Sequence, residues 1–263
     1  MRLIDYFWEK IVIGRASALM RKHRQGGRRT AVIAGDYLSL KVMLQGRFED
    51  KLISVLEGRV LRDMAPGSVC LDIGANIGNH SIAFAKWFSR VYAFEPNPET
   101  FDVLALNAKW SSGRIFPFNV GASDREFDAP AVVPADNLGG ARITAAAPVP
   151  QAGIEPLRFN CVRLDEYLPE DVTRNVSFIK VDVEGHEYQA LSGCRRIIEA
   201  ARPLVAFELL RKDHEANGNR IRSLLDGYGY KYYYDVGRGL RLITRFRRKN
   251  YKMILASCRK LEA

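Results

Sequence analysis

The segment from Val69 to Phe88, VCLDIGANIGNHSIAFAKWF, constrains the fold of this chain more than any other. It begins with a short apolar run that ends on an acid, turns through Gly74 and Gly78, and continues with apolar residues at helical spacing. A strand that passes through a glycine turn directly into a helix is typical of a parallel α/β sheet, where ligands bind at the ends of the strands. The segment therefore predicts both a fold class and the place of a ligand.

The rest of the chain repeats this alternation of strands and helices. Further strands are expected at 90–95, 114–120, 176–182, 203–210, 231–236 and 251–258, and helices at 50–64, 98–110, 186–201 and 217–230. Apolar, β-branched runs that alternate with helices indicate parallel strands with helices on both faces. We expect an α/β fold with a doubly wound, mostly parallel sheet of seven strands.

Residues 1–50 are expected to form an N-terminal helical extension. Leu3, Phe7 and Ile11 recur at helical spacing, and the basic run RKHRQGGRR follows at 21–29. The apolar face has two uses that the sequence leaves open, packing on the main domain or a second subunit, and docking on an anionic membrane. No run reaches the ~20 apolar residues of a membrane span. Asp5, Glu9 and Lys10 interrupt the apolar N-terminus and no small-residue cleavage site follows, so we expect the protein in the cytoplasm, free or docked on the cytoplasmic face of a membrane.

The main domain is expected to span residues 51–263, with an insert at 127–156 that is rich in Ala, Gly and Pro. The insert is too long for a simple connection between strands, which favours a lid or a substrate wall; the alternative is a surface hairpin that binds nothing. The net charge of +10 is concentrated at 21–29 and 238–249. Such runs indicate either a solvated surface or an anionic partner, and charge alone does not choose between them.

Two acids and two glycines indicate the ligand. The turn has Asn76 where a dinucleotide fingerprint has its second glycine, and Asp72 at the strand end would repel a pyrophosphate but suits an amino group. Glu95 ends the next strand, where an acid can accept both hydroxyls of a ribose. A ligand with an ammonium group, a ribose and no phosphate is S-adenosylmethionine. The alternative is that these acids only cap helices.

Several segments resemble, in order, the FkbM-type S-adenosylmethionine-dependent methyltransferases. They are LDIGANIGNHSIAFA, AFEPNPETFDVLALN, NVGASD, NLGGARI, VRLDEYL, FIKVDVEGHEYQALSGC and RPLVAFEL. The resemblance covers roughly residues 45–255 and implies a Rossmann-like class I methyltransferase fold. It also implies methyl transfer to a hydroxyl group, often of a sugar in a natural product or surface glycan.

The resemblance further implies which residues bind the methyl donor. The methionine side would meet the loop that follows the first strand, the ribose would meet Glu95, and the adenine would lie at the end of the third strand. Either Ser123 or Asp124 is an alternative adenine contact. The expected donor-binding residues are Asp72, Gly74, Ala75, Asn76, Gly78, Asn79, Glu95, Pro96, Asn97, Asn119, Val120 and Ala122.

A sugar hydroxyl is a poor nucleophile at neutral pH, so a base is expected beside the methyl group. Asp182 comes directly off the fourth strand and is our first choice as base or substrate anchor, with His186 as the alternative and Glu184 as a further catalytic candidate. Glu184 could instead cap the following helix. Asp182, Glu184 and Glu208 could also hold Mg²⁺, but nothing in their spacing demands a metal, and none is expected.

The acceptor side is expected in the insert. Asn137, Gly139, Gly140 and Arg142 match the N-x-G-G element of the family, and Arg142 could meet a hydroxyl or an anionic group. The expected partner is a small-molecule or glycan acceptor; the oligomeric state is left open. Two other functions are compatible with the sequence, a nucleic-acid methyltransferase because of the basic runs, and a non-catalytic scaffold that keeps the fold. No N-P-P-Y-type element follows the fourth strand, which disfavours the former.

Overall fold

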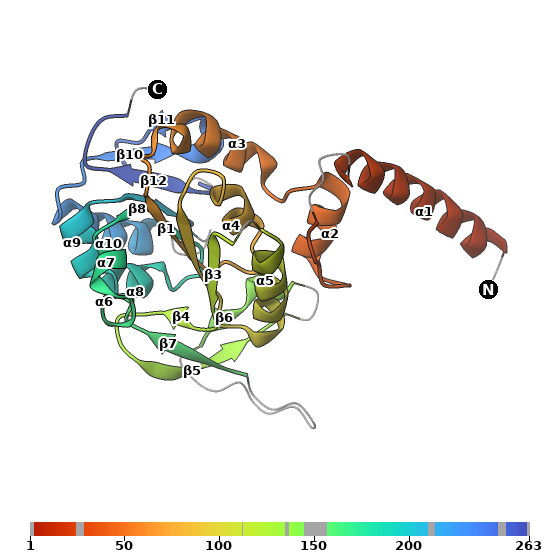
Figure 1. The fold of residues 1–263 in the computed structure, drawn as a ribbon, viewed down its shortest axis with the longest axis horizontal. Helices are drawn as coiled ribbons and strands as arrows, with labels where there is room; N and C mark the ends of the chain where they lie inside the picture. The colour runs from red at the N-terminus through yellow and green to blue at the C-terminus, as the bar shows by residue number, and fades with distance from the viewer. Residues whose placement is uncertain are drawn as a thin grey trace.

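The computed structural model describes residues 3–24, 29–111, 113–134, 137–144, 157–209, 214–246 and 251–261. An eight-stranded sheet with the order β11-β10-β12-β9-β8-β1-β2-β3 forms the centre of the molecule (Figure 1). Its strands are β1 (Val69–Ile73), β2 (Arg90–Phe94), β3 (Ile115–Phe118), β8 (Val176–Val181), β9 (Leu204–Phe207), β10 (Tyr232–Asp235), β11 (Arg241–Leu242) and β12 (Ile254–Ser257). The expected doubly wound α/β fold is confirmed.

The expected number of seven strands is wrong by one. The five strands from β3 to β9 are parallel, whereas β12 runs antiparallel to both β9 and β10, and β11 runs antiparallel to β10. The eighth strand, β11, follows a turn at Gly239, whose φ is 72°, and both of its residues are exposed. An exposed two-residue edge strand has no alternating buried side chains, so the hydrophobic pattern does not predict it, and these residues stand out in the sequence only as part of the basic run at 238–249.

Helices cover both faces of the sheet (Figure 1). On one side lie α4 (Asn79–Phe84) and α5 (Pro98–Trp110), and on the other lie α8 (Glu187–Ser192), α9 (Arg195–Ala201) and α10 (His214–Asp226). The single helix expected at 186–201 is divided into α8 and α9. At the division, a Cβ atom on Gly193 would lie 1.9 Å from the carbonyl oxygen of Ser123, so this close approach requires glycine.

A second, four-stranded sheet has the order β4-β7-β5-β6. It consists of β4 (Gly121–Ala122), β5 (Phe127–Val132), β6 (Arg142–Ile143) and β7 (Arg158–Val162), and the short 3₁₀ helix η2 (Leu138–Gly140) lies between β5 and β6. The insert expected at 127–156 therefore contributes two strands and a 3₁₀ helix. Its residues 135, 136 and 145–156 lie outside the described residues.

The N-terminal helix α1 (Leu3–Arg24) projects from the body of the molecule and contacts α2 (Tyr37–Gln45) (Figure 1). Asp36 is the N-cap of α2, and one of its carboxylate oxygens accepts a hydrogen bond from the amide of Ser39. The other oxygen accepts a hydrogen bond of 3.0 Å from the amide of Leu138 in η2. This bond ties the segment before the main sheet to the insert. The remaining helices are α3 (Asp50–Arg59), η1 (Leu61–Asp63), α6 (Leu164–Tyr167), α7 (Glu170–Thr173) and η3 (Val236–Arg238). Among the described helices, none is long and apolar enough to cross a membrane.

Candidate functional site

A cavity of about 210 Å³ opens where the strands β1, β2, β8 and β9 end. Its lining includes the loop after β1, the segment that follows β2, the residues that follow β8 and β9, the residues just before α3, and η2 with its neighbours, together with residues of α2, α4, β4 and β7. In a sheet of parallel strands the carboxyl ends meet at one edge, which is where ligands bind. The cavity lies at the place that the glycine turn predicted.

The loop between β1 and α4 is held against the loop after β8. Gly74 has a φ of 76°, and a Cβ atom on it would lie 1.8 Å from the carbonyl oxygen of Asp182. Asn76 has a φ of 51°, which is uncommon for a residue with a side chain and costs of order 1–3 kcal/mol. Glu184, across the cavity, has a φ of 52°. Strained backbone thus occurs on both sides of the same cavity, which is typical of functional sites.

Glu95 fixes the shape of this loop. One oxygen of its carboxylate accepts a hydrogen bond of 2.8 Å from the amide of Asn76, and the other accepts one of 2.9 Å from the amide of Asn97. Burial raises the pKa of Glu95, although these two amides oppose the shift. The side-chain amide of Asn119 donates to the carbonyl oxygens of Glu95 and Pro96 and so holds the adjoining wall.

The floor of the cavity contains a buried lysine. Lys180 is 1% exposed, and its ammonium group donates a hydrogen bond of 2.8 Å to the carbonyl oxygen of Gly74. The same group lies 3.1 Å from Asp72 and 3.6 Å from Asp182. Burial disfavours the lysine cation, but the two aspartates outweigh burial and raise the pKa of Lys180. The lysine thus connects β1, the glycine loop and the loop after β8.

Carboxyl groups gather on the opposite wall. Asp182 and Glu208 follow the neighbouring strands β8 and β9 and hydrogen-bond to each other. Burial alone raises the pKa of Asp182, but Lys180 and the bond from Glu208 outweigh it and hold this pKa below its usual range. Burial and the charge of Asp182 raise the pKa of Glu208 to about 10. Burial and the neighbouring acids Asp182 and Glu187 raise the pKa of Glu184 to about 7.

Two histidines line the cavity, and both are neutral at pH 7. Burial and the charge of Lys180 lower the pKa of His80 to about 4, and its ring lies 3.7 Å from the carboxylate of Glu49. Burial lowers the pKa of His186, whose Nε2 lies 3.0 Å from the hydroxyl of Ser123. His186 is therefore already engaged with Ser123.

The structure brings many of the predicted site residues together. Those that line the cavity are Gly74, Ala75, Asn76, Asn79, Glu95, Pro96, Ala122, Asn137, Asp182, Glu184 and His186. The other predicted residues lie outside its lining: Asp72, Gly78, Asn97, Asn119, Val120, Gly140 and Arg142. Asp72 lies beneath the loop, where it accepts a hydrogen bond from Ser81. Arg142 is exposed on β6.

Sequence reasoning did not identify some residues of the cavity as site residues. Lys180 stands out in retrospect, because a charged residue inside the apolar run VSFIKV needs a buried partner. Glu49 precedes α3, and Tyr37 and Phe48 come from the segment assigned to the N-terminal extension; no motif marks any of them. Within the described ranges, no group of three or more His, Cys, Asp or Glu side chains is placed to hold a metal ion.

Comparison with known proteins identifies relatives. Residues 72–232 match the family described as the methyltransferase FkbM domain. The hexuronic acid methyltransferase AglP of Haloferax volcanii is 28% identical over 144 residues, which cover 54% of this chain and 56% of that protein. The chain therefore matches about half the length of this curated relative.

A solved structure gives the same result for the fold. The crystal structure of methyltransferase FkbM from Methylobacillus flagellatus KT superposes with a TM-score of 0.50 at 20% sequence identity. The superposition covers 94% of this chain and 60% of that chain. At this level of identity the likeness concerns the fold alone.

Proposed function

Because the chain belongs to the FkbM methyltransferase family, we propose that it transfers a methyl group from S-adenosylmethionine to a hydroxyl group of a sugar. The observation that carries this proposal is the arrangement of Glu95 and Asp182 on two walls of one cavity, with the Gly74 loop between them. Methyl transfer to a hydroxyl needs an acid that binds the ribose of the donor and a base that accepts the hydroxyl proton, both in the same cavity.

The donor side of the cavity fits S-adenosylmethionine. Glu95 is buried but lines the cavity, and each of its carboxylate oxygens accepts one loop amide and keeps a second lone pair that can accept from a ribose hydroxyl. Gly74 lets the loop after β1 pack directly against the backbone of Asp182, because a Cβ atom there would lie 1.8 Å from the Asp182 carbonyl oxygen. The donor supplies a methyl group already activated on a sulfonium, so the protein has only to align the hydroxyl and accept its proton.

The acceptor side is assigned to Asp182 and the insert. Asp182 has a side chain that is 28% exposed, and Lys180 holds it ionised, so it can accept a proton from a hydroxyl at neutral pH. Asn137 and Gly139 of the insert line the same cavity. We place the sugar between Asp182 on one side and Asn137 and Gly139 on the other. The name of the relative from Haloferax volcanii, a hexuronic acid methyltransferase, supports a sugar as acceptor.

Replacing Glu95 tests the donor site. We expect Glu95→Ala to weaken S-adenosylmethionine binding by about 1.5–3 kcal/mol, the usual worth of a hydrogen bond to a charged group. Isothermal titration calorimetry measures the loss, and a thermal melt checks that the variant is folded. Glu99→Ala is the matched control, because Glu99 is a nearby glutamate in the first turn of α5 that does not line the cavity. Unchanged donor affinity in folded Glu95→Ala would remove Glu95 from the site.

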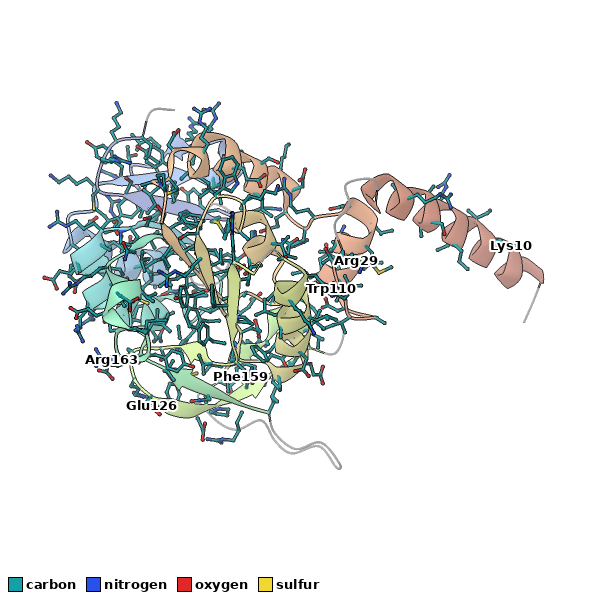
Figure 2. All side chains as sticks on the ribbon, viewed as in Figure 1. Lys10, Arg29, Trp110, Glu126, Phe159 and Arg163 are labelled. Carbon is teal, nitrogen blue, oxygen red and sulfur yellow. The ribbon has the colours of Figure 1, made fainter. Side chains whose placement is uncertain are left out.

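We also propose that α1 docks on an anionic membrane surface. Val12, Ile13 and Leu19 are 62%, 54% and 42% exposed on this projecting helix, and the exposed Arg15 lies among them. Figure 2 shows Lys10 on the same projecting part, away from the body. Exposed apolar side chains beside cations are the combination that binds anionic lipid, at ~1 kcal/mol for each cation.

Vesicle sedimentation tests this proposal. We expect the protein to pellet with vesicles that contain phosphatidylserine and not with phosphatidylcholine vesicles, and Val12→Ser/Leu19→Ser to abolish pelleting. Protein that stays in the supernatant with both vesicle types at low salt contradicts it. A helix-dependent dimer in sedimentation equilibrium would assign the face to a second copy instead.

A further inference from the structure

We propose that Asp182 and Glu208 form one proton-sharing pair that releases its proton when a sulfonium enters the cavity and takes up the hydroxyl proton when the methyl group leaves. This inference rests on the proposed function, because it needs a sulfonium donor in this cavity. It makes Glu208, which the sequence suggested only as a metal ligand, a catalytic residue. It also explains how Asp182 acts as a base while bound to two partners.

The position of the pair in the sheet carries the proposal. The strands β8 and β9 are parallel neighbours in which Val181 pairs with Phe207, and the amide of Glu208 donates a hydrogen bond of 3.0 Å to the carbonyl oxygen of Val181. The next residue on each strand is an acid, so the two carboxyls emerge side by side at the cavity. Two carboxyls that hydrogen-bond to each other must hold one proton between them. Here the Glu208 carboxyl donates and the Asp182 carboxylate accepts.

The surroundings of the pair make its charge sensitive to a cation. The groups that face it are Lys180, Glu49, Glu184 and His80, and Glu187 and Asp72 lie behind them. Lys180 is the one cation among these groups and is shared between Asp72 and Asp182, while Lys252 and Arg142 act on the outlying acids Glu49 and Glu184. The cavity therefore has an excess of carboxyls that an entering positive charge can compensate. Burial and neighbouring acids raise the pKa of Glu208 to about 10, and a sulfonium opposes that shift.

The proton balance then closes over one turnover. A sulfonium enters, and the proton of the pair passes to the solvent, which leaves two carboxylates. As the bond between sulfur and the methyl carbon breaks and the bond between the hydroxyl oxygen and that carbon forms, the positive charge on sulfur disappears. The pair takes up the hydroxyl proton and returns to its one-proton state. A pair of carboxylates beside a sulfonium is a stronger base than Asp182 bonded to a protonated Glu208.

Calorimetry with S-adenosylmethionine and S-adenosylhomocysteine tests this inference. The two ligands share the ammonium, carboxylate and ribose and differ in the sulfonium. Each is titrated at about pH 8.5, where Glu184 is already ionised, in two buffers of different ionisation enthalpy. We expect S-adenosylmethionine to release about one proton more than S-adenosylhomocysteine. Its affinity relative to S-adenosylhomocysteine should therefore rise by up to about tenfold for each unit by which the pH is raised toward 8.5.

Two variants locate the proton. Glu208→Gln keeps the shape and removes the titrating group, so both ligands should release equal numbers of protons. Glu99→Gln is the control, because Glu99 lies in the first turn of α5 and outside the cavity lining, and it should keep the difference. Equal proton release by both ligands in the unsubstituted protein overturns the inference while leaving the proposed function standing, and so does a difference that survives in Glu208→Gln. If neither ligand binds, the proposed function fails first.

Discussion

Asp182→Asn is expected to lower the rate of methyl transfer by ~10²–10⁴-fold, the usual contribution of a general base, while the donor still binds. The amide has the same shape as the carboxylate but cannot accept a proton. Its neighbours Lys180 and Glu208 remain in place, so the loop after β8 should keep its position. Single-turnover transfer from tritiated S-adenosylmethionine to a glycan fraction measures the rate, and calorimetry measures donor affinity.

His186→Gln is the control for this experiment. Its ring is neutral and engaged with Ser123, so we expect its loss to change the rate by less than about tenfold. The opposite ranking, with His186→Gln inactive and Asp182→Asn active, would transfer the base role to the histidine. Asp182→Asn that no longer binds the donor would make Asp182 a donor ligand.

Lys180→Met is expected to lower the free energy of unfolding by about 3–5 kcal/mol, the usual cost of removing one partner from a buried ion pair. Methionine fills a similar volume but leaves Asp72 fully buried without a cation, and the described residues offer its Oδ1 no other partner. The raised pKa keeps Lys180 charged until the pH rises through that pKa, so the loss is expected throughout the neutral range. Urea unfolding measures it.

Two further variants check the cause of this loss. Lys86→Met removes a lysine that is 42% exposed and lies 3.3 Å from Glu57, and it should cost no more than about 1 kcal/mol. Adding Asp72→Asn to Lys180→Met should recover part of the stability, because the buried charge is then gone. If the double variant is less stable than Lys180→Met, the ion pair is not the source of the effect.

The cavity wall formed by the strand ends could be predicted because each of its parts is marked at the end of a strand. Gly74 and Glu95 follow β1 and β2, and Asp182 follows β8. A parallel sheet brings the ends of its strands to one edge, so acids and glycines at those places meet whatever the loops between them do. These signals are local, and one sequence is enough to read them.

The remainder of the site depends on contacts between distant parts of the chain. Asp72 is at a strand end in the sequence, but it is fully buried and pairs with Lys180, which is 108 positions away. Glu49 comes to the cavity from a segment without a motif, because Phe48 and Asn79 hydrogen-bond to each other. In the insert, β5 pairs with β7 and β6 pairs with β5, so the existence of each strand depends on a partner that periodicity does not reveal.

The most direct test of the central claim is the product of the reaction. The purified protein is incubated with tritiated S-adenosylmethionine and a fractionated extract of cells that produce it, and the labelled product is identified by mass spectrometry. The account predicts a carbohydrate that has gained the mass of one CH₂ group on a hydroxyl oxygen, with no label in the Asp182→Asn reaction. Label that appears in RNA, DNA or protein instead, or in no fraction although the donor binds, would contradict it.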